Sequence, residues 1–246
     1  MHVDMCNILY ISYSNNPYYI ARVYAILSIQ LLFTAATIHG FHLNPGIRNW
    51  MMFHPAGRKV PLLGLLVSTI TWWITLGSEN IRQSPLKWPL LLAFTAGESL
   101  AVGFISSIYA YSTVIKAMVT TALSTFSITI YTLMQKNPKY DLTQWGRGLA
   151  SVGFAFLMFG VMRMLELFGI IPYHFLPYSE ALYCIFGAGL FSMYLAYHTR
   201  LIVSGKSAKY QMSEKDYILG AMSLYSDIIN IFLYILRLLG ELDDRD

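Results

Sequence analysis

This chain has little charge for its length. Only 12% of its 246 residues are charged, whereas an average soluble domain has about 25%. Apolar residues make up 56% of the chain, and its mean hydropathy is +0.50. So few charges do not cover the surface of a soluble globule, and so many apolar residues exclude a disordered tail protein. We therefore expect a membrane protein that crosses the bilayer several times.

Cysteine is scarce as well. Cys6 and Cys184 alone cannot form a disulfide framework, and no CxxC or Cys/His cluster favours a zinc site. The sequence has no Asn-x-Ser/Thr acceptor for glycosylation. The net charge of +4 is small, and no run of Lys and Arg favours nucleic acid. We therefore expect neither a cofactor nor a nucleic-acid partner.

Long apolar stretches recur along the whole chain. A membrane-spanning helix needs about 20 mostly apolar residues, so seven spans would use about 140 residues. The apolar runs, and the Gly, Pro and polar residues between them, predict helices at about Arg22–His39, Pro61–Leu76, Pro89–Tyr111, Val114–Met134, Gly148–Phe168, Glu180–Tyr197 and Tyr217–Leu239. The expected fold class is an all-α polytopic membrane protein with seven transmembrane helices.

The same reading divides the chain into three parts. Residues 1–20 are expected to be a short polar N-terminal segment, 21–240 the seven-helix domain, and 241–246 an acidic tail. The first segment lacks the basic start, short apolar core and cleavage site of a secretory signal. We therefore expect it to remain as a cytosolic N-terminus.

The distribution of Lys and Arg bears on this orientation, because cytosolic loops carry an excess of them. A cytosolic N-terminus places ten on the cytosolic side: Arg22, Arg82, Lys87, Lys136, Lys139, Arg147, Arg200, Lys206, Lys209 and Lys215. It places seven on the other side: Arg48, Arg58, Lys59, Lys116, Arg163, Arg237 and Arg245. The difference favours a cytosolic N-terminus, although the first loop argues against it.

An acidic residue lies near the middle of the last predicted helix. Ser223, Asp227, Asn230 and Tyr234 share one helix face, and the opposite positions are apolar. A carboxylate inside a membrane span costs about 2.5–3.5 kcal/mol on insertion scales, so Asp227 should face the bundle interior beside a partner or water. It is either part of an ion or proton pathway or a structural hydrogen-bond anchor.

A second acid, Glu98, lies in the third predicted helix with Thr95 and Ser99 on nearby faces. Oxygen ligands suit calcium, so Asp227 and Glu98 are candidates for transient calcium contacts, although no complete metal site can be assigned. The alternative is a protonated Glu98 that caps a neighbouring group.

The fourth predicted helix carries a stripe of hydroxyl groups, Thr120, Ser124, Ser127 and Tyr131, at i, i+4, i+7 and i+11. Such stripes mediate hydrogen bonds and close packing between membrane helices. Pore lining is the alternative interpretation.

Several motifs together carry a family resemblance. The chain reads RVYAILSIQLL from Arg22, FT before Glu98, IYTL from Ile130, YHTRLI from Tyr197, MSEKDY from Met212 and LYSDIINIFL from Leu224. This order resembles the transmembrane Bax-inhibitor-motif family, whose usual form is YDTQLI followed by SxEEYIxAALxLYLDIINLFL. The resemblance covers about residues 20–240. The short polar N-terminus looks more like the Golgi anti-apoptotic (lifeguard 4) branch than the glutamate-receptor-associated one.

The resemblance implies a fold and a function. The last of seven helices would be central, and the protein would form a pH-sensitive calcium leak in the endoplasmic reticulum or Golgi membrane. Such a leak lowers stored calcium and suppresses apoptosis and endoplasmic-reticulum stress signalling. The alternative is a non-conducting scaffold that inhibits cell death by contacting other membrane cell-death regulators. We expect no enzyme, because no nucleophile–base pair, HExxH or GxGD-type motif is present.

One position departs from the family pattern. The family pairs the aspartate of YDTQ with that of LYLDIIN, whereas here His198 occupies the first position and Asp227 the second. The second predicted helix also lacks an internal arginine to hold a carboxylate pair. We expect His198, at the cytosolic end of the sixth helix, to pair with Asp227 as a pH gate that loosens as pH rises. The alternatives are a His198 that points into the headgroups and a site that no longer conducts.

Overall fold

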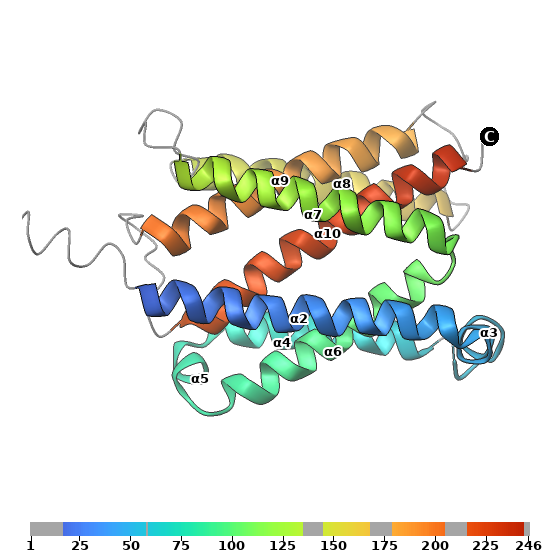
Figure 1. The fold of residues 1–246 in the computed structure, drawn as a ribbon, viewed down its shortest axis with the longest axis horizontal. Coiled ribbons are helices and arrows are strands. Elements are labelled where there is room, and N and C mark those ends of the chain that lie inside the picture. The colour runs from blue at the N-terminus through green and yellow to red at the C-terminus, as the bar shows by residue number, and fades with distance from the viewer. Residues whose placement is uncertain (1–16, 58, 135–144, 168–178, 205–215, 244–246) are drawn as a thin grey trace, which may run out of the picture. The chain divides into compact units, whose positions relative to one another are not determined.

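The computed structural model describes residues 17–57, 59–134, 145–167, 179–204 and 216–243, which form helices and no strand (Figure 1). The helices are α2 (Pro17–Leu43), α3 (Pro45–Phe53), α4 (Lys59–Gly77), α5 (Glu79–Gln83), α6 (Lys87–Ser106), α7 (Tyr111–Met134), α8 (Gly146–Leu167), α9 (Ser179–Ser204) and α10 (Tyr217–Asp243). The all-α class predicted from the sequence is confirmed.

Six helices in the described ranges are long and apolar enough to cross a membrane: α2, α4, α6, α7, α9 and α10. Helix α8 (Gly146–Leu167) occupies the place of the fifth predicted helix, and Gly146–Gly160, the part of it whose side chains are described, is apolar. The protein is therefore a multi-pass membrane protein. A total of seven spans and a central position for the last helix stay predictions.

Several predicted boundaries were wrong, among them the start of α2, the end of α6 and the end of α9. Helix α2 begins at Pro17, inside the segment predicted as polar N-terminus, because proline is pre-organised for the first turn of a helix. Helix α6 ends at Ser106 and not near Tyr111. The amide of Ser107 donates to the carbonyls of both Gly103 and Phe104, which tightens and ends this last turn.

Two short helices lie where the sequence indicated only helix breakers. Helix α3 starts at Pro45, directly after Asn44, and α5 follows Ser78. Proline and serine at these positions stop one helix and start the next, so a reading of apolar runs finds the interruption and misses the short helix.

The chain folds into two compact units. The first contains Met1–Val114 and Leu201–Ser226, and the second Ile115–Arg200 and Asp227–Asp246. Helix α10 contributes its start, as far as Ser226, to the first unit and the remainder to the second.

In the first unit, α6 packs against both α2 and α4 (Figure 1). The α4–α6 crossing is close because Gly64 and Gly97 face each other. A Cβ atom on Gly64 would lie 2.8 Å from the carbonyl oxygen of Gly97. Gly103 similarly accommodates the ring of Phe41 on α2. Small residues thus allow these membrane helices to approach each other.

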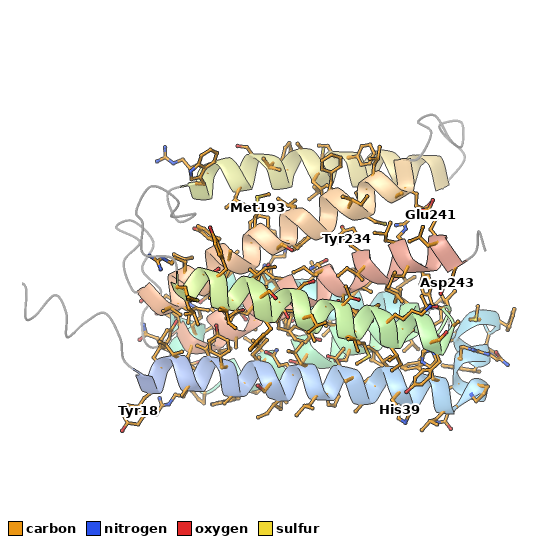
Figure 2. All side chains as sticks on the ribbon, turned by 45° about the horizontal axis from the view of Figure 1, so that its top comes forward. Tyr18, His39, Met193, Tyr234, Glu241 and Asp243 are labelled. Atoms are coloured by element: carbon orange, nitrogen blue, oxygen red, sulfur yellow. The ribbon has the colours of Figure 1, made fainter. Side chains whose placement is uncertain are left out.

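In the second unit, tyrosines of α9 and α10 fill the space beside glycines. The ring of Tyr183 stacks on Phe156 of α8 with centroids 4.6 Å apart, and Tyr234 of α10 packs against Gly187. Tyr234 is labelled in Figure 2. The hydroxyl of Tyr194 donates to the carbonyl of Leu149 at 3.0 Å, which connects α9 to α8.

Candidate functional site

The second unit contains a short contact between two helices. Nδ1 of His198 on α9 lies 2.6 Å from Oδ2 of Asp227 on α10. The Asp227 side chain is 5% exposed and the His198 side chain 20%. With Asp227 ionised, Nδ1 carries the proton and donates to the carboxylate. The pair that the family pattern implied is therefore present, with histidine at the first position.

The sequence analysis predicted that His198 lies at the end of its helix, and this prediction was wrong. Helix α9 continues as far as Ser204, because Leu201, Ile202 and Val203 extend the apolar run. The imidazole points to its partner, Asp227. It can therefore act on Asp227 from within the helix.

Aromatic rings surround this imidazole. The Tyr194 ring stacks on it at a centroid distance of 6.0 Å, and the Tyr197 ring meets it edge-on at 5.4 Å. Tyr194 is itself held by Leu149 of α8, and Tyr197 packs against Gly146. The sequence analysis missed both tyrosines, although the i, i+4 spacing of Tyr194 and His198 is a usable signal. These rings restrict the orientation of the His198 side chain.

The other members of the predicted α10 face have different surroundings. The Ser223 hydroxyl is buried and donates to Leu219 of its own helix at 2.9 Å. Asn230 is half-buried. The Tyr234 hydroxyl lies 3.4 Å from that of Tyr183. The described contacts thus bring His198 to Asp227 within the second unit, whereas Ser223 belongs to the first unit.

Glu98 lies in the first unit, on α6, near Ser68 of α4, whose hydroxyl donates to the carbonyl of Leu65 in its own helix. Its neighbours Thr95 and Ser99 take part in a buried polar cluster with α2. Nε2 of Gln30 donates to Thr95 at 2.8 Å. Glu98 is therefore a half-buried acid beside hydroxyl groups, as the sequence suggested.

The buried polar cluster also reaches α10. Thr34 Oγ1 lies 2.9 Å from the Ser99 hydroxyl and 2.8 Å from that of Tyr225. Gln30 Oε1 is buried and has no hydrogen-bond partner among the described residues, so it can accept a bond from water. The sequence analysis missed Gln30, Thr34 and Tyr225. Tyr225 belongs to the LYxDIIN motif, which was the available signal.

The hydroxyl stripe of α7 makes no bond to another helix among the described contacts, so helix packing and pore lining both stay predictions. Thr120, Ser127 and Tyr131 are exposed, and Ser124 is half-buried. The hydroxyls of Thr120 and Ser127 donate to carbonyls one turn earlier in their own helix. A hydroxyl that bonds to a carbonyl of its own helix can face an apolar environment. The spacing of hydroxyl residues along a helix therefore does not by itself identify a buried face. The buried positions of α7 lie on an adjacent face: Thr113, Val114, Ala117, Thr121 and Thr132.

A second ion pair was not expected from the sequence. Helix α4 indeed contains no arginine, but Arg82 on α5 lies 2.7 Å from Asp216, just before α10. The guanidinium also donates to the carbonyls of Thr75 and Leu76 at the end of α4. Arg82 therefore joins the end of α4 to the start of α10 in the first unit.

No group of three or more His, Cys, Asp and Glu side chains suited to a metal occurs within the described residues. A calcium contact at Asp227 or Glu98 would thus use carboxylate oxygens together with hydroxyls, carbonyls or water.

Comparison with known proteins gives one family for the whole described chain. The family described as inhibitor of apoptosis-promoting Bax1 matches residues 17–244. Mouse lifeguard 3 is 31% identical over 225 residues, which are 92% of this chain and 69% of that protein. Mouse lifeguard 4 is 33% identical over 230 residues, covering 92% and 86%. The Golgi anti-apoptotic protein of Vaccinia virus (strain Lister) is 28% identical over 221 residues, covering 90% and 84%.

Proposed function

The chain belongs to the Bax inhibitor family of membrane proteins, and we propose that it is a pH-sensitive calcium leak of endomembranes. In this role it lowers stored calcium and thereby suppresses apoptosis and stress signalling from the endoplasmic reticulum. The observation that carries the proposal is the 2.6 Å contact between His198 and Asp227. A buried carboxylate in a membrane helix is expensive, and such residues commonly mark ion or proton pathways.

The pair is suited to gating because histidine ordinarily changes its charge near neutral pH. When the imidazole is protonated, its charge attracts Asp227 and holds α9 to α10. When the proton is lost, the ion pair becomes a weaker neutral–ion hydrogen bond. The contact therefore loosens as pH rises, and the carboxylate becomes available to a passing cation.

Glu98 supplies the second acid of the proposed pathway. It lies beside Ser68, and the nearby Gln30 Oε1 is an unused acceptor. Uncharged oxygens around a single carboxylate bind calcium weakly, which suits a leak because the ion must also leave.

A flux measurement tests this function. Purified protein is reconstituted in liposomes loaded with calcium, and efflux is followed with a fluorescent indicator. Asp227→Asn keeps the shape of the side chain and removes its charge, so it should abolish the flux. Asp243→Asn is the matched control, because it makes the same change on the same helix at a side chain that is 42% exposed.

Two outcomes would contradict the proposal. A wild-type protein that is folded by circular dichroism and gel filtration but passes no calcium would exclude the leak. Unchanged flux in Asp227→Asn, at a matched amount of protein, would remove this residue from the pathway.

The second candidate function is a non-conducting scaffold that inhibits cell death by binding other membrane regulators of this process. Two observations favour it. Asp227 already has a hydrogen-bond partner, which also fits a structural anchor. The Vaccinia virus relative is named for an anti-apoptotic role, and its name mentions no ion transport. A variant that still protects cells from apoptosis after its flux is abolished would support the scaffold.

For the location we propose the Golgi or endoplasmic-reticulum membrane. The name of the Vaccinia relative includes the Golgi. Co-localisation of the tagged chain with markers of the two organelles distinguishes them.

A further inference from the structure

At the start of α10, two cations converge on one aromatic ring. Lys87 Nζ, from α6, lies 4.8 Å from the centroid of the Tyr217 ring. The guanidinium carbon of Arg22, from α2, lies 5.9 Å from the same centroid. All three residues belong to the first unit. The face of an aromatic ring attracts a cation, but it carries no net charge that could balance two of them.

The carboxylate next to this ring in the sequence does not supply that balance. Asp216 precedes Tyr217 in the chain and is ion-paired with Arg82 at 2.7 Å. Within the described part of the chain, neither Arg22 nor Lys87 forms an ion pair with a carboxylate. Among the described residues at this end of the unit, three cations, Arg22, Arg82 and Lys87, outnumber two carboxylates, Asp216 and the exposed Glu79 of α5.

The helix ends add to the positive potential. Helix α6 begins at Lys87 and α10 begins at Tyr217. At the start of α6 the amides of Lys87, Trp88 and Leu90 already donate to backbone carbonyls, so this helix end contributes only the positive end of its dipole. Because these two helix starts lie beside the two cations, the combined site favours a compact anion.

The surroundings indicate that this anion is attached to a lipid. Trp88, whose ring lies 6.2 Å from Tyr217, is 47% exposed, and the adjoining Leu86 is 59% exposed. Tryptophan and tyrosine are enriched at the level of the headgroups. The sequence predicts that this end faces the cytosol, where the leaflet is rich in anionic lipids.

We propose that Arg22 and Lys87, with the rings of Tyr217 and Trp88, form a binding site for the phosphate headgroup of an acidic phospholipid. The phosphate binds beside the two cations at the Tyr217 ring, and the acyl chains follow the exposed apolar side chains of α6. The occupied site ties α2, α6 and α10 together at one end of the first unit.

Native mass spectrometry of the full chain tests this proposal. The protein is released from nanodiscs that contain phosphatidylcholine and phosphatidylserine, and the retained lipids are counted. The wild type should retain phosphatidylserine in preference to phosphatidylcholine. The Arg22→Gln/Lys87→Gln variant should bind it about 30-fold more weakly, the loss expected for two cations near an anionic surface.

Two further variants separate a site from general attraction. Arg48→Gln/Lys59→Gln removes the same charge beyond the opposite end of α2 and should retain the lipid as the wild type does. Tyr217→Leu removes the ring and no charge, and it should weaken retention, whereas Tyr217→Phe should not. Each variant is first shown to be folded by circular dichroism.

Three results would overturn the proposal. One is equal retention by the wild type and Arg22→Gln/Lys87→Gln. Another is an equal loss in Arg48→Gln/Lys59→Gln. The third is displacement of the lipid by millimolar inorganic phosphate, which would identify a site for a free anion.

Discussion

His198 and Asp227 connect α9 and α10 through a single contact of 2.6 Å, in which the histidine takes the place of an acid in the family pattern. The exchange changes the chemistry of the pair. Two carboxylates stay together by sharing a proton, and they repel each other once both are ionised. A histidine and a carboxylate attract each other while the histidine is charged. Both pairs loosen as pH rises, although for different reasons.

The Arg82–Asp216 pair should stabilise the first unit. Arg82→Gln removes the charge-assisted bond to Asp216 and weakens the cap on the α4 carbonyls, and we expect a loss of about 2 kcal/mol in the free energy of unfolding. Lys116→Gln is the control, because its 3.5 Å pair with Asp243 is exposed and should contribute less than about 1 kcal/mol. Thermal unfolding in detergent measures both. Equal losses would show that Arg82 has no special role.

The close crossing of α4 and α6 should not tolerate a side chain at Gly97. A Cβ there would clash with the carbonyl oxygen of Gly64, so Gly97→Ala should cost about 1–3 kcal/mol. Gly40→Ala makes the same change within α2, where no atom lies within 4 Å of the new Cβ, and should gain up to about 1 kcal/mol. Unfolding curves in the same detergent compare them. If Gly97→Ala left the free energy of unfolding unchanged, that result would contradict the close crossing of α4 and α6.

Glu98→Gln should reduce calcium flux without abolishing it. The amide keeps a polar contact near Ser68 and removes one of the two intramembrane acids. The effect should be weaker than that of Asp227→Asn, because Glu98 has no charged partner among the described contacts that could gate it. Efflux from the same liposomes ranks the two variants. Greater sensitivity at Glu98 would place the main charge of the pathway in the first unit.

The N-terminus should face the cytosol, as the distribution of Lys and Arg predicts. Position 206 lies outside the described residues, but the sequence places it in a cytosolic loop. A chain with Lys206→Cys as its single cysteine should react with an impermeant maleimide from the cytosolic side of sealed vesicles. Labelling from the lumenal side alone would reverse the orientation.

The helices could be predicted because the apolar runs are long and their interruptions are clear. Each of the seven predicted helices has a counterpart, and the errors are at helix ends, such as Pro17 and Ser106, and in the two short helices α3 and α5, which were missed. The sequence also singled out Asp227 and Glu98, because an acidic residue within an apolar run is costly to place in a membrane. The partner of Asp227 came from the family motif and not from the spacing.

The remaining contacts depend on neighbours that are distant in sequence. Thr34 meets Tyr225 across 191 positions, and Arg82 meets Asp216 across 134, so no local pattern relates the members of either pair. The role of the stripe that includes Thr120 and Ser127 stays a prediction. Their hydroxyls bond to their own helix, so a polar face need not be a buried one.

The pH dependence of calcium flux in variants of His198 tests the central claim most directly. Flux from liposomes is measured across neutral pH for the wild type, His198→Ala and His198→Asp, each shown to be folded. We predict that wild-type flux rises with pH and that His198→Ala loses most of this dependence. His198→Asp should restore a titration of the dicarboxylate kind. An identical pH profile in all three proteins would contradict the claim that His198 and Asp227 form the gate.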